Sequence, residues 1–524
     1  MSEHVGAALE RAGALFGERE AVVDGDLRWS YAELRRRAAA FDAALDGLGL
    51  AEGDVVGVLG LNSAPHLVAW LAVPRSGRVL NDLNVRLAPA EIQFILDDSR
   101  VRVLLVDDAF LEVGRALARS CPALEHLVHA GAGAAPEGCL SFAELTEGEG
   151  RPARLVHPDA VAGIFYTGGT TGLPKGAMLS HRNLVANAKH MLINQRYTDA
   201  DTYLHAAPMF HLADGASTLA LTWVAGRHVI IPSFEPERWL RAVAAERVTR
   251  ALLVPTMISM VVNHPAVVEH DVSSLRGMLY GASPMPQGLL RRAMEVLPCD
   301  WTQAYGMTEA APVVTNLTPD DHRRGAAGEE PYVDRLRSAG RPVVGVEAEV
   351  RRPDGSRAGV GETGEIWARG PNIMQGYWNR PQETAAALDG EGWYRTGDAA
   401  YADAGGYLFI VDRVKDMIIS GGENVYSVEV ENAVYQHPAV LECAVFGIPD
   451  AEWGERVHAV IVCRPGTGAG ADEIVDHCRT LIAGYKVPRS VEFRDEALPK
   501  SGAGKILKRE LRQPFWEGRE RQVS

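Results

Sequence analysis

The first 150 residues alternate between two hydrophobic patterns. Residues 32–48 put apolar side chains on one face of a predicted helix and arginines on the other, and residues 63–73 predict a second, more apolar helix. Residues 54–59 and 101–106 are short, continuous apolar runs of the kind found in buried strands. Strands that alternate with helices predict parallel sheets covered by helical layers.

The pattern changes after residue 340. Residues 346–350 and 364–368 alternate between apolar and polar positions, and turns such as Pro353-Asp354-Gly355 separate such segments. This predicts a small antiparallel barrel or sheet. From residue 413 onward, a glycine turn and a helix predict a compact α+β domain.

The predicted fold class is therefore α/β, with a large N-terminal domain and a smaller C-terminal one. The N-terminal domain, residues 1–412, would contain two βα-layered subdomains and the small barrel. The charge-rich segment Asp412–Asp416 marks the boundary, and residues 413–524 would form a mobile C-terminal domain.

A glycine- and threonine-rich stretch, Tyr166–Gly176, carries the clearest chemistry. An apolar run over residues 160–166 predicts a strand before it, and a helix is predicted from His181. Glycines let successive backbone N–H groups converge on an anion, and Lys175 adds a positive charge. The stretch predicts a site for a nucleoside triphosphate. It is not the common phosphate loop, because Lys175 is followed by Gly176 rather than Ser or Thr.

This stretch resembles the phosphate-binding signature of the adenylate-forming superfamily, which includes acyl-CoA synthetases, luciferases and the adenylation domains of peptide synthetases. Further motifs of the superfamily follow in its order, at residues 303–309, 393–398, 412–416 and 498–506. The resemblance implies that ATP and Mg²⁺ activate a carboxylic acid to acyl-AMP with release of pyrophosphate. CoA, a co-substrate, then accepts the acyl group after the C-terminal domain has rotated.

The resemblance also implies roles for individual residues in nucleotide binding. The pyrophosphate would be held by Thr167, Gly168, Gly169, Thr170, Thr171, Gly172 and Lys175, although many relatives have Ser where Gly168 stands. The adenine pocket would be formed by Gly281, Ala282, Ser283, Tyr305, Gly306 and Met307, with Tyr305 stacked on the base. Thr308 would bind a phosphate oxygen, Glu309 would hold Mg²⁺, and Asp398 and Arg413 would contact the ribose.

The remaining implied residues concern catalysis and CoA. Lys505 would bridge the substrate carboxylate and the α-phosphate, and Lys415 would be the hinge. The tunnel for the pantetheine arm would be framed by Gly421, Gly422 and Glu423, with Trp453 against the CoA adenine; Tyr485, Lys486 and Arg489 would meet CoA phosphates. Only seven of the 53 basic residues are lysines, so a lysine here is a mild pointer to a place that needs a compact ammonium.

The acid substrate is predicted from His211, which the resemblance places in the acid tunnel. Amino-acid-activating relatives commonly have an aspartate there, so His211 argues against an amino acid, while Asp214 keeps that alternative open. The small residues Ala213, Gly215 and Ala216 would leave room for a bulky group. We expect a medium- or long-chain or bulky apolar acid, and an aryl acid remains open.

Composition excludes several other classes. A net charge of −15 argues against a nucleic-acid partner. The sequence shows neither a secretory signal nor an apolar run of about 20 residues that would span a bilayer. The six scattered cysteines form no C-x-x-C pair, which argues against a zinc site or a disulfide framework and favours the cytoplasm.

Three alternatives stay open at this stage. The first is a ligase that passes its acyl-AMP to a carrier protein, because carrier loading uses the same C-terminal domain. The second is a non-catalytic, regulatory ATP-binding relative, and the third is a luciferase-like oxygenase. Both homodimers and monomers occur among relatives, so the oligomeric state is also open.

Overall fold

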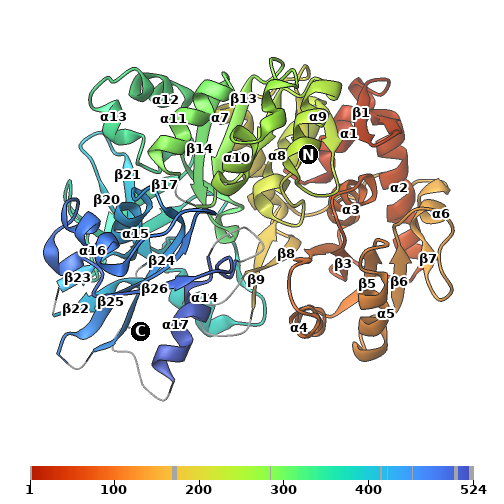
Figure 1. Ribbon diagram of the computed structural model, residues 1–524. Helices are drawn as coiled ribbons and strands as arrows, with labels where there is room; N and C mark the ends of the chain where they lie inside the picture. Colours follow the sequence, from red (N-terminus) through yellow and green to blue (C-terminus); the bar gives the residue numbers. More distant parts are fainter. Residues whose placement is uncertain are drawn as a thin grey trace. The chain divides into compact units, whose positions relative to one another are not determined.

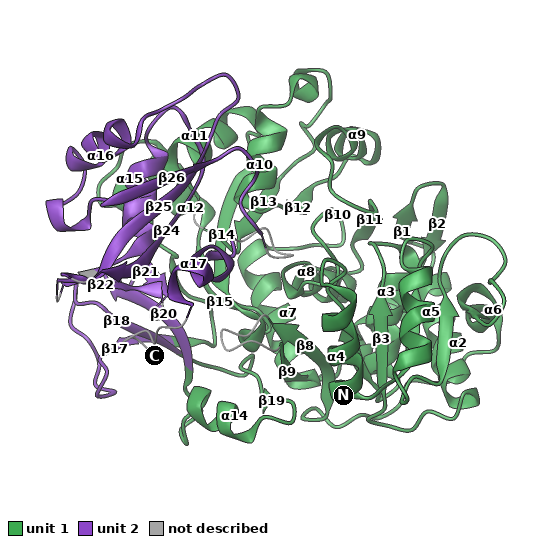
Figure 2. Cartoon of the chain, turned by 60° about the horizontal axis from the view of Figure 1, so that its bottom comes forward, with its two compact units in different colours: residues 1–347, 368–394 green, residues 348–367, 395–524 purple. Residues whose placement is uncertain are grey.

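The structure is a computed structural model that describes residues 3–167, 174–283, 285–413, 416–421, 423–450, 452–500 and 506–517 (Figure 1). The chain divides into two compact units, drawn in different colours in Figure 2. Unit 1 comprises residues 1–347 and 368–394, and unit 2 comprises residues 348–367 and 395–524.

One sheet of unit 1 follows the order β19-β9-β8-β4-β3-β5-β6-β7 over the described residues. Its strands are β3 (Val55–Leu59), β4 (Val79–Asp82), β5 (Val101–Val106), β6 (His126–His129), β7 (Leu140–Ser141), β8 (Val161–Thr167), β9 (Lys175–Ser180) and β19 (Gly376–Tyr377). The central strands are parallel, whereas β9 runs antiparallel to both β8 and β19.

The other sheet of unit 1 has the order β16-β15-β14-β13-β12-β10-β11-β1-β2 within the described ranges. Its strands are β1 (Glu20–Asp24), β2 (Leu27–Ser30), β10 (Thr202–His205), β11 (Arg227–Ile230), β12 (Arg250–Leu252), β13 (Gly277–Gly281), β14 (Asp300–Gly306), β15 (Val313–Leu317) and β16 (Arg341–Pro342). Strands β11, β10, β12, β13 and β14 pair in parallel in that order, and β15 pairs antiparallel with β14.

Helices accompany both sheets. They are α1 (Gly6–Leu15), α2 (Tyr31–Gly47), α3 (Ala64–Arg75), α4 (Pro89–Ser99), α5 (Leu111–Ser120), α6 (Phe142–Glu147), α7 (His181–Gln195), α8 (Leu212–Val224), α9 (Pro236–Glu246), α10 (Pro255–Val262), α11 (Gln287–Val296), α12 (Pro319–Ala326), α13 (Tyr332–Arg335) and α14 (Pro381–Ala387), with short 3₁₀ turns η1 (Pro265–Val268) and η2 (Thr308–Ala310). In the described part of the chain, no helix is both long and apolar enough to cross a membrane.

The apolar runs became strands because both of their faces are covered. Ile164 of β8 belongs to a buried cluster with residues of α4 and α5, whereas the ring of Phe165 lies 5.8 Å from that of Trp70 on α3. Successive side chains of a strand point to opposite faces, so helices pack on both sides of this sheet (Figure 1). The predicted βα layering is confirmed.

Helix α3 continues two residues beyond its predicted end, through Pro74 and Arg75. Proline is tolerated in this last turn because it removes only one helical hydrogen bond. Arg75 is 1% exposed, and its guanidinium bonds to Glu10 at 2.8 Å and to Asp42 at 2.6 Å. Arg78, equally buried, reaches the other oxygen of Asp42 at 3.4 Å. An ion network therefore fixes α3 on α2.

The described residues of unit 2 form two sheets, and the first has the strand order β17-β18-β20-β21. The strands are β17 (Glu347–Arg351), β18 (Gly364–Arg369), β20 (Tyr394–Ala402) and β21 (Leu408–Arg413). This four-stranded sheet stands where the small barrel was predicted. This sheet belongs to the same compact unit as the C-terminal residues. The mobile domain predicted from residue 413 stays a prediction, because its mobility is a rotation of that domain.

The second sheet of unit 2 has the order β23-β22-β25-β24, with β26 beside β25. Its elements are β22 (Ile418–Ser420), β23 (Glu423–Val425), β24 (Val440–Asp450), β25 (Gly454–Cys463) and β26 (Ser490–Arg494), with helices α15 (Ser427–Tyr435), α16 (Ala471–Arg479) and α17 (Lys508–Trp516) and the 3₁₀ turn η4 (Gly484–Lys486). One apolar cluster packs α15 and α16 on the sheet, and another packs α17 on it.

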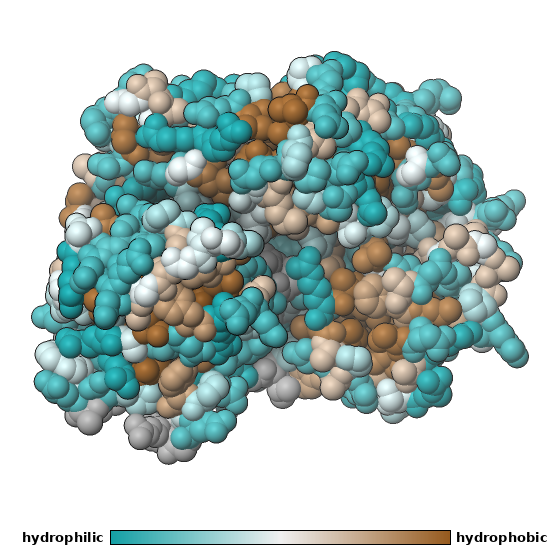
Figure 3. Space-filling model, in the orientation of Figure 1, coloured by the Kyte–Doolittle hydropathy of each residue, from teal (hydrophilic) through white to brown (hydrophobic). Residues whose placement is uncertain are grey.

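Apolar side chains also reach the surface, and hydrophobic areas lie among hydrophilic residues on the face drawn in Figure 3. The most exposed large apolar residues include Leu155, Val268 and Val360. These three residues come from distant parts of the sequence, so they do not form one amphipathic element.

The Asp42 network gives a stability prediction. We expect Asp42→Asn to lower the free energy of unfolding by about 3 kcal/mol, because two buried guanidinium groups lose their shared carboxylate. Urea denaturation of the full chain measures this change. The control is Glu237→Gln, which breaks an exposed pair with Arg241 on α9 and should cost about 0.5 kcal/mol or less. Equal effects of the two variants would contradict a structural role for the network.

Candidate functional site

The glycine-rich stretch is the connection of a β-hairpin. Strands β8 and β9 pair antiparallel, with Thr167 opposite Lys175, and the Thr167 hydroxyl donates to the Lys175 carbonyl at 3.5 Å. The predicted phosphate-binding residues Gly168, Gly169, Thr170, Thr171 and Gly172 lie outside the described residues. Helix α7 begins at His181 as predicted, but a strand precedes it.

Strand β9 was missed by the sequence analysis, although its pattern offered a signal. Ala177 and Leu179 are fully buried on either side of the half-buried Met178, but Gly176 and Ser180 are buried too, so the alternation is short. The consequence is geometric. A hairpin fixes the two ends of the connection side by side, and it places Lys175 at the first position after it.

The residues predicted to line the adenine pocket lie at the ends of two adjacent parallel strands. Gly281 of β13 pairs with Ala304 of β14, and Tyr305 and Gly306 complete β14. A Cβ atom on Gly281 would lie 2.2 Å from the Ala304 carbonyl oxygen, and one on Gly306 would lie 1.8 Å from the Pro312 carbonyl oxygen. Only glycine fits at both positions, because the backbone of a neighbouring segment lies against each of them.

The next residues place the predicted magnesium ligand. Ala282 has a positive φ of 66° and carries the chain on to Ser283, while Met307 precedes the turn η2, which contains Thr308 and Glu309. Glu309 is buried in this turn, and its carbonyl accepts a hydrogen bond from the Met374 N–H at 2.8 Å.

Tyr377 was not predicted, and it contacts two predicted site residues. Its hydroxyl donates to Glu309 Oε1 at 2.9 Å, and the Lys175 ammonium lies 5.5 Å from the centroid of its ring. The contact depends on the pairing of β19 with β9, which joins segments about 200 residues apart. Nothing in the local sequence around Tyr377 could have indicated this pairing.

The Glu309 carboxylate fits the magnesium role. Mg²⁺ bound with a nucleotide takes one or two protein carboxylates and otherwise uses phosphate and water oxygens. Among the described residues, no group of three or more His, Cys, Asp or Glu side chains gathers into a protein-only metal cage. A lone, oriented carboxylate is the donor set that such an ion needs.

His211 does not end a strand, as the sequence analysis expected. Strand β10 ends at His205, and His211 is the N-cap of α8, where its Nδ1 accepts from the Ala213 N–H at 3.2 Å. An acceptor at Nδ1 puts the proton of the neutral ring on Nε2. The side chain is half-buried, so its predicted contact with the acid stays a prediction.

Asp214 is committed to the protein interior. It is fully buried, and its two oxygens bind His205 Nδ1 at 2.6 Å and the Tyr203 hydroxyl at 3.1 Å. His205 Nε2 continues to His228 Nδ1 at 2.9 Å, and burial together with His205 holds the pKa of His228 well below its usual value. The arrangement removes the support for Asp214 as the partner of a substrate amine.

The lack of a side chain at Gly215 makes room for a neighbouring helix and not for the substrate. A Cβ atom at this position would lie 2.5 Å from the ring of Trp70. The space beside Gly215 is therefore filled by helix α3 and is not available to an acyl group. This corrects the expectation that Gly215 leaves room for a bulky substrate.

In unit 2, the two residues predicted to contact ribose lie directly opposite each other. Asp398 of β20 pairs with Arg413 of β21 in the antiparallel register, and their side chains form an ion pair at 2.6 Å. An arginine that holds a carboxylate in one orientation leaves its other oxygen suited to accept from hydroxyl groups. The predicted hinge Lys415 lies outside the described residues.

The predicted CoA residues are partly brought together. Gly421 has a positive φ of 62°, its N–H donates to the Trp453 carbonyl at 2.8 Å, and a Cβ atom there would lie 2.6 Å from the Trp453 ring. The Arg489 guanidinium lies 4.2 Å from the centroid of the same ring. Glu423 begins β23, whereas Gly422 and Lys505 lie outside the described residues.

Lys486 and Tyr485 differ in their surroundings. The Lys486 ammonium is 2.6 Å and 2.8 Å from the two oxygens of Glu429, so its charge is already compensated within the protein. Tyr485 is exposed beside it. Of the three residues suggested for CoA phosphates, Arg489 thus keeps the clearest contact with another predicted CoA residue, Trp453.

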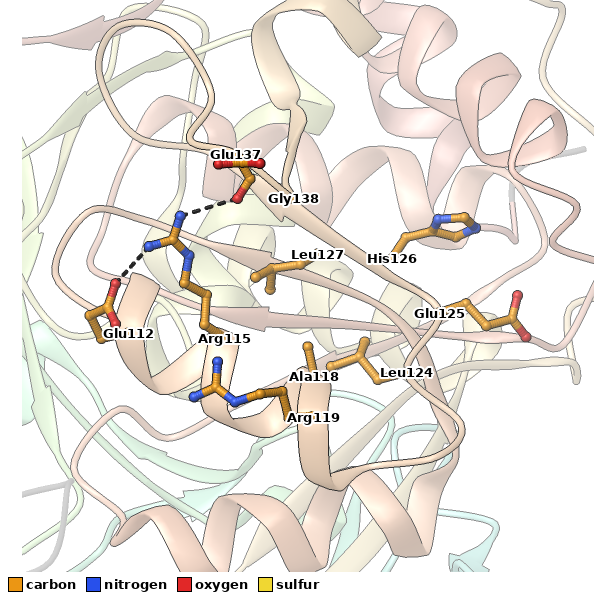
Figure 4. A pocket seen from close by; sticks show the side chains of 10 residues that line it. All are labelled: Glu112, Arg115, Ala118, Arg119, Leu124, Glu125, His126, Leu127, Glu137 and Gly138. Atoms are coloured by element: carbon orange, nitrogen blue, oxygen red, sulfur yellow. Dashed lines mark hydrogen bonds and ion pairs between the residues drawn. The ribbon is translucent and has the colours of Figure 1, made fainter.

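A surface depression of about 540 Å³ lies elsewhere on unit 1, between α5 and the loops around β6 (Figure 4). Arg115 projects along it and bonds to Glu112 at 2.9 Å and to the Glu137 carbonyl at 3.1 Å. Its lining includes none of the predicted site residues. The depression therefore has no part in the site described above.

Comparisons with known proteins find related enzymes. The family described as "AMP-binding enzyme" matches residues 9–378, and the "AMP-binding enzyme C-terminal domain" matches residues 429–505. The chain is 41% identical to a feruloyl-CoA synthase of Amycolatopsis sp, over 94% of this chain and 96% of the relative. It is 35% identical to the fatty acid–[acyl-carrier-protein] ligase ScoC of Streptomyces coeruleorubidus, over 94% and 93%.

A solved structure is also similar along the whole chain. The anthranilate CoA ligase AuaEII in complex with anthranoyl-AMP superimposes with a TM-score of 0.88 at 28% identity, covering 98% of this chain and 97% of that one. Together with the two family matches, this similarity confirms the predicted fold class.

The Tyr377 contact yields a prediction for magnesium dependence. We expect Tyr377→Phe to raise the Mg²⁺ concentration needed for half-maximal acyl-AMP formation about tenfold, because Glu309 loses a hydrogen bond to its charged form. Pyrophosphate exchange over a Mg²⁺ titration measures this. Tyr197→Phe, which removes a buried hydroxyl bonded to Ser217 in the same unit, is the matched control. An unchanged Mg²⁺ dependence would show that Tyr377 does not orient Glu309.

The Asp214 network gives a second prediction. Asp214→Asn should lower the free energy of unfolding by about 3 kcal/mol, because a buried carboxylate with two partners is lost. Activities with amino-substituted and unsubstituted forms of one acid should fall by the same factor. A selective loss of the amino-substituted acid would instead place Asp214 against the substrate. Exposed Asp271→Asn serves as the control and should change neither quantity.

Proposed function

This chain belongs to the family of AMP-binding enzymes and is an AMP-forming acid–CoA ligase, and we propose that its acid substrate is an apolar aryl or arylalkenoic acid. The ligase uses ATP, Mg²⁺ and CoA. The observation that carries the proposal is the 41% identity to a feruloyl-CoA synthase over nearly the whole of both chains. The identity to the fatty acid ligase is lower, at 35%.

The interior of unit 1 supports a substrate without an amino group. Both oxygens of Asp214 are bound by His205 and Tyr203. His211 is half-buried at the N-cap of α8, and its ring is neutral when its Nδ1 accepts a hydrogen bond. A neutral imidazole next to the acid suits an apolar or aromatic body better than an ammonium group. His211 would thus contact the ring or chain of the acid.

In the first half-reaction, the carboxylate attacks the α-phosphorus of ATP and pyrophosphate leaves. The protein's contribution is to position the reactants and to stabilise developing charge. Lys175 and the loop before it would hold the pyrophosphate, Thr308 would donate to a phosphate oxygen, and Lys505 would bridge the carboxylate and the α-phosphate. Mg²⁺ held by Glu309 would neutralise charge on the phosphate oxygens.

In the second half-reaction, the CoA thiolate attacks the acyl-AMP carbonyl and AMP leaves. We place Gly421, Gly422 and Glu423 along the pantetheine arm and Trp453 against the CoA adenine. The close contact of Gly421 with Trp453 supports the idea that the loop at Gly421 and the neighbouring turn at Trp453 serve the two parts of CoA. A rotation of the C-terminal domain about Lys415 would exchange Lys505 for this loop, and it would keep water from the reactive anhydride.

A carrier protein is the alternative acceptor. The similarity to ScoC, a ligase that acts with an acyl-carrier protein, is the observation that favours it. Such an acceptor presents the same thiol-bearing arm as CoA, so the adenylation step would be unchanged. The two acceptors are told apart by what happens to acyl-AMP when CoA is supplied.

Two further properties are part of the proposal. All six cysteines are free thiols, which supports a reducing compartment such as the cytoplasm. The second property is a homodimer, which light scattering on the purified chain tests.

The decisive experiment is mass spectrometry of the products formed from ATP, Mg²⁺, CoA and a panel of acids. The panel contains hydroxycinnamic acids, an indole acid, long-chain fatty acids and a small dicarboxylic acid. We expect aryl-CoA thioesters at a rate at least tenfold above the fatty acyl-CoA products, with acyl-AMP formation lost in Lys505→Ala. Lys189→Ala is the matched control, because Lys189 is an exposed lysine on α7.

Each other outcome has a definite meaning. Faster reaction with long-chain fatty acids would overturn the aryl proposal and leave the ligase activity intact. Accumulation of acyl-AMP with CoA untouched would point to a carrier protein as the acceptor. Full adenylation activity in Lys505→Ala would overturn the catalytic assignment of that lysine.

A further inference from the structure

Lysines flank the segment 501–505 on both sides, and each is held by a glutamate. Lys500 forms an ion pair with Glu442, whose other oxygen accepts from the Leu498 N–H at 2.8 Å. On the other side, the Lys508 ammonium lies 2.7 Å from Glu431 Oε1 and 2.5 Å from the Ser427 hydroxyl. In a chain that otherwise uses arginine, this use of lysine needs an explanation.

The chain on both sides of this segment is also paired through its backbone. Lys500 and Ile506 form an antiparallel bridge, and the Leu507 N–H donates to the Pro499 carbonyl at 2.8 Å. Helix α17 begins at Lys508. The position of residue 506 relative to the sheet is therefore set by residues 499–500 on one side and by the anchoring of Lys508 on the other.

The Lys508 contacts continue to the predicted ribose-binding pair. Ser427, which binds Lys508 through its hydroxyl, donates its N–H to Asp412 Oδ2 at 2.5 Å. The other oxygen of Asp412 accepts from the Arg413 N–H at 2.7 Å, and Arg413 holds Asp398. Within unit 2, these contacts form one chain from the start of α17 to the residues expected at the nucleotide.

The Lys508 side chain is half-buried in this network, with 16% of it exposed. Burial alone would lower the pKa of Lys508, but the carboxylates of Glu431, Asp412 and Asp416 outweigh it and raise that pKa. Burial also raises the pKa of Glu431 and of Asp412. A buried ionic network is costly compared with an apolar contact of the same size, and its benefit lies in fixing one arrangement.

We propose that Lys508 is a positioning residue for acyl-AMP formation, and that its contacts with Glu431 and Ser427, continued by Ser427 to Asp412, set the chain that follows Lys505 relative to the ribose-binding pair. The inference rests on the proposed role of Lys505. Lys508 contacts protein groups and acts through its neighbours, so its removal should affect the rate of the step that needs Lys505 more than substrate binding.

The test separates the two half-reactions. Lys508→Met keeps an unbranched side chain, one atom shorter, and removes its charge. We expect kcat for acyl-AMP formation to fall about 100-fold, with KM for ATP and for the acid changed less than about threefold. Thioester formation from supplied acyl-AMP and CoA should change less than about threefold. Lys508→Arg restores the charge and should recover part of the rate, because its planar group fits the ammonium site imperfectly.

The matched control is Tyr435→Phe, at the end of helix α15, which also carries Ser427 and Glu431. It removes a hydroxyl that donates to the Cys443 carbonyl at 3.2 Å and accepts from its N–H at 2.9 Å, so it destabilises unit 2 without touching the network. Thermal unfolding of all variants calibrates this loss. If Lys508→Met unfolds, Glu431→Gln tests the same pairing with a smaller change.

The outcomes distinguish this inference from the function on which it rests. If Lys505→Ala abolishes adenylation while Lys508→Met slows both half-reactions equally, or neither, the positioning role is overturned and the proposed function stands. If Lys505→Ala leaves adenylation intact, the proposed role of Lys505 and the positioning role fall together. A selective loss in Lys508→Met, absent in Tyr435→Phe, supports the inference.

Discussion

The hydrogen bond from Tyr377 to Glu309 depends on three segments that are far apart in the sequence. The pairing of β19 with β9 brings Tyr377 beside Lys175, and the turn η2 presents Glu309 to its hydroxyl. A carboxylate that is to hold a metal ion beside phosphates must be kept from turning toward a nearby ammonium group. The phenol of Tyr377, which contacts Glu309 through its hydroxyl and Lys175 through its ring, satisfies the carboxylate with a neutral donor.

Local patterns predicted the strands and helices around the motifs. Gly281 and Gly306 were assigned to the adenine pocket by the resemblance, and the structure leaves no space for any other residue at either position. Features that depend on distant pairings could not be predicted. Tyr377 needed the β19–β9 pairing, and the commitment of Asp214 needed His205 and Tyr203 on β10. Residue type alone allowed Asp214 either to bind a substrate or to stabilise the core.

Both units use ion networks, buried in unit 1 and half-buried in unit 2, where apolar contacts would have been less costly. Arg75 and Arg78 share Asp42 in unit 1, and Lys508 binds Glu431 and Ser427 in unit 2. Apolar side chains of similar size can slide past one another, whereas an ion pair with hydrogen bonds to fixed atoms permits few alternatives. Such networks are therefore expected where an element must keep one position, as α3 does on α2.

The choice of cation differs between these networks for a geometric reason. Arg75 binds two carboxylates and a backbone carbonyl in different directions, which the planar guanidinium can reach with separate N–H groups. Lys508 instead meets a carboxylate and a hydroxyl within 2.7 Å of one atom, an arrangement that suits a compact ammonium with three donors on one nitrogen. In a chain with 46 arginines and seven lysines, random replacement would favour arginine at such a position. Its retention as lysine fits a requirement for exact placement, since an arginine there would push Glu431 and Ser427 apart.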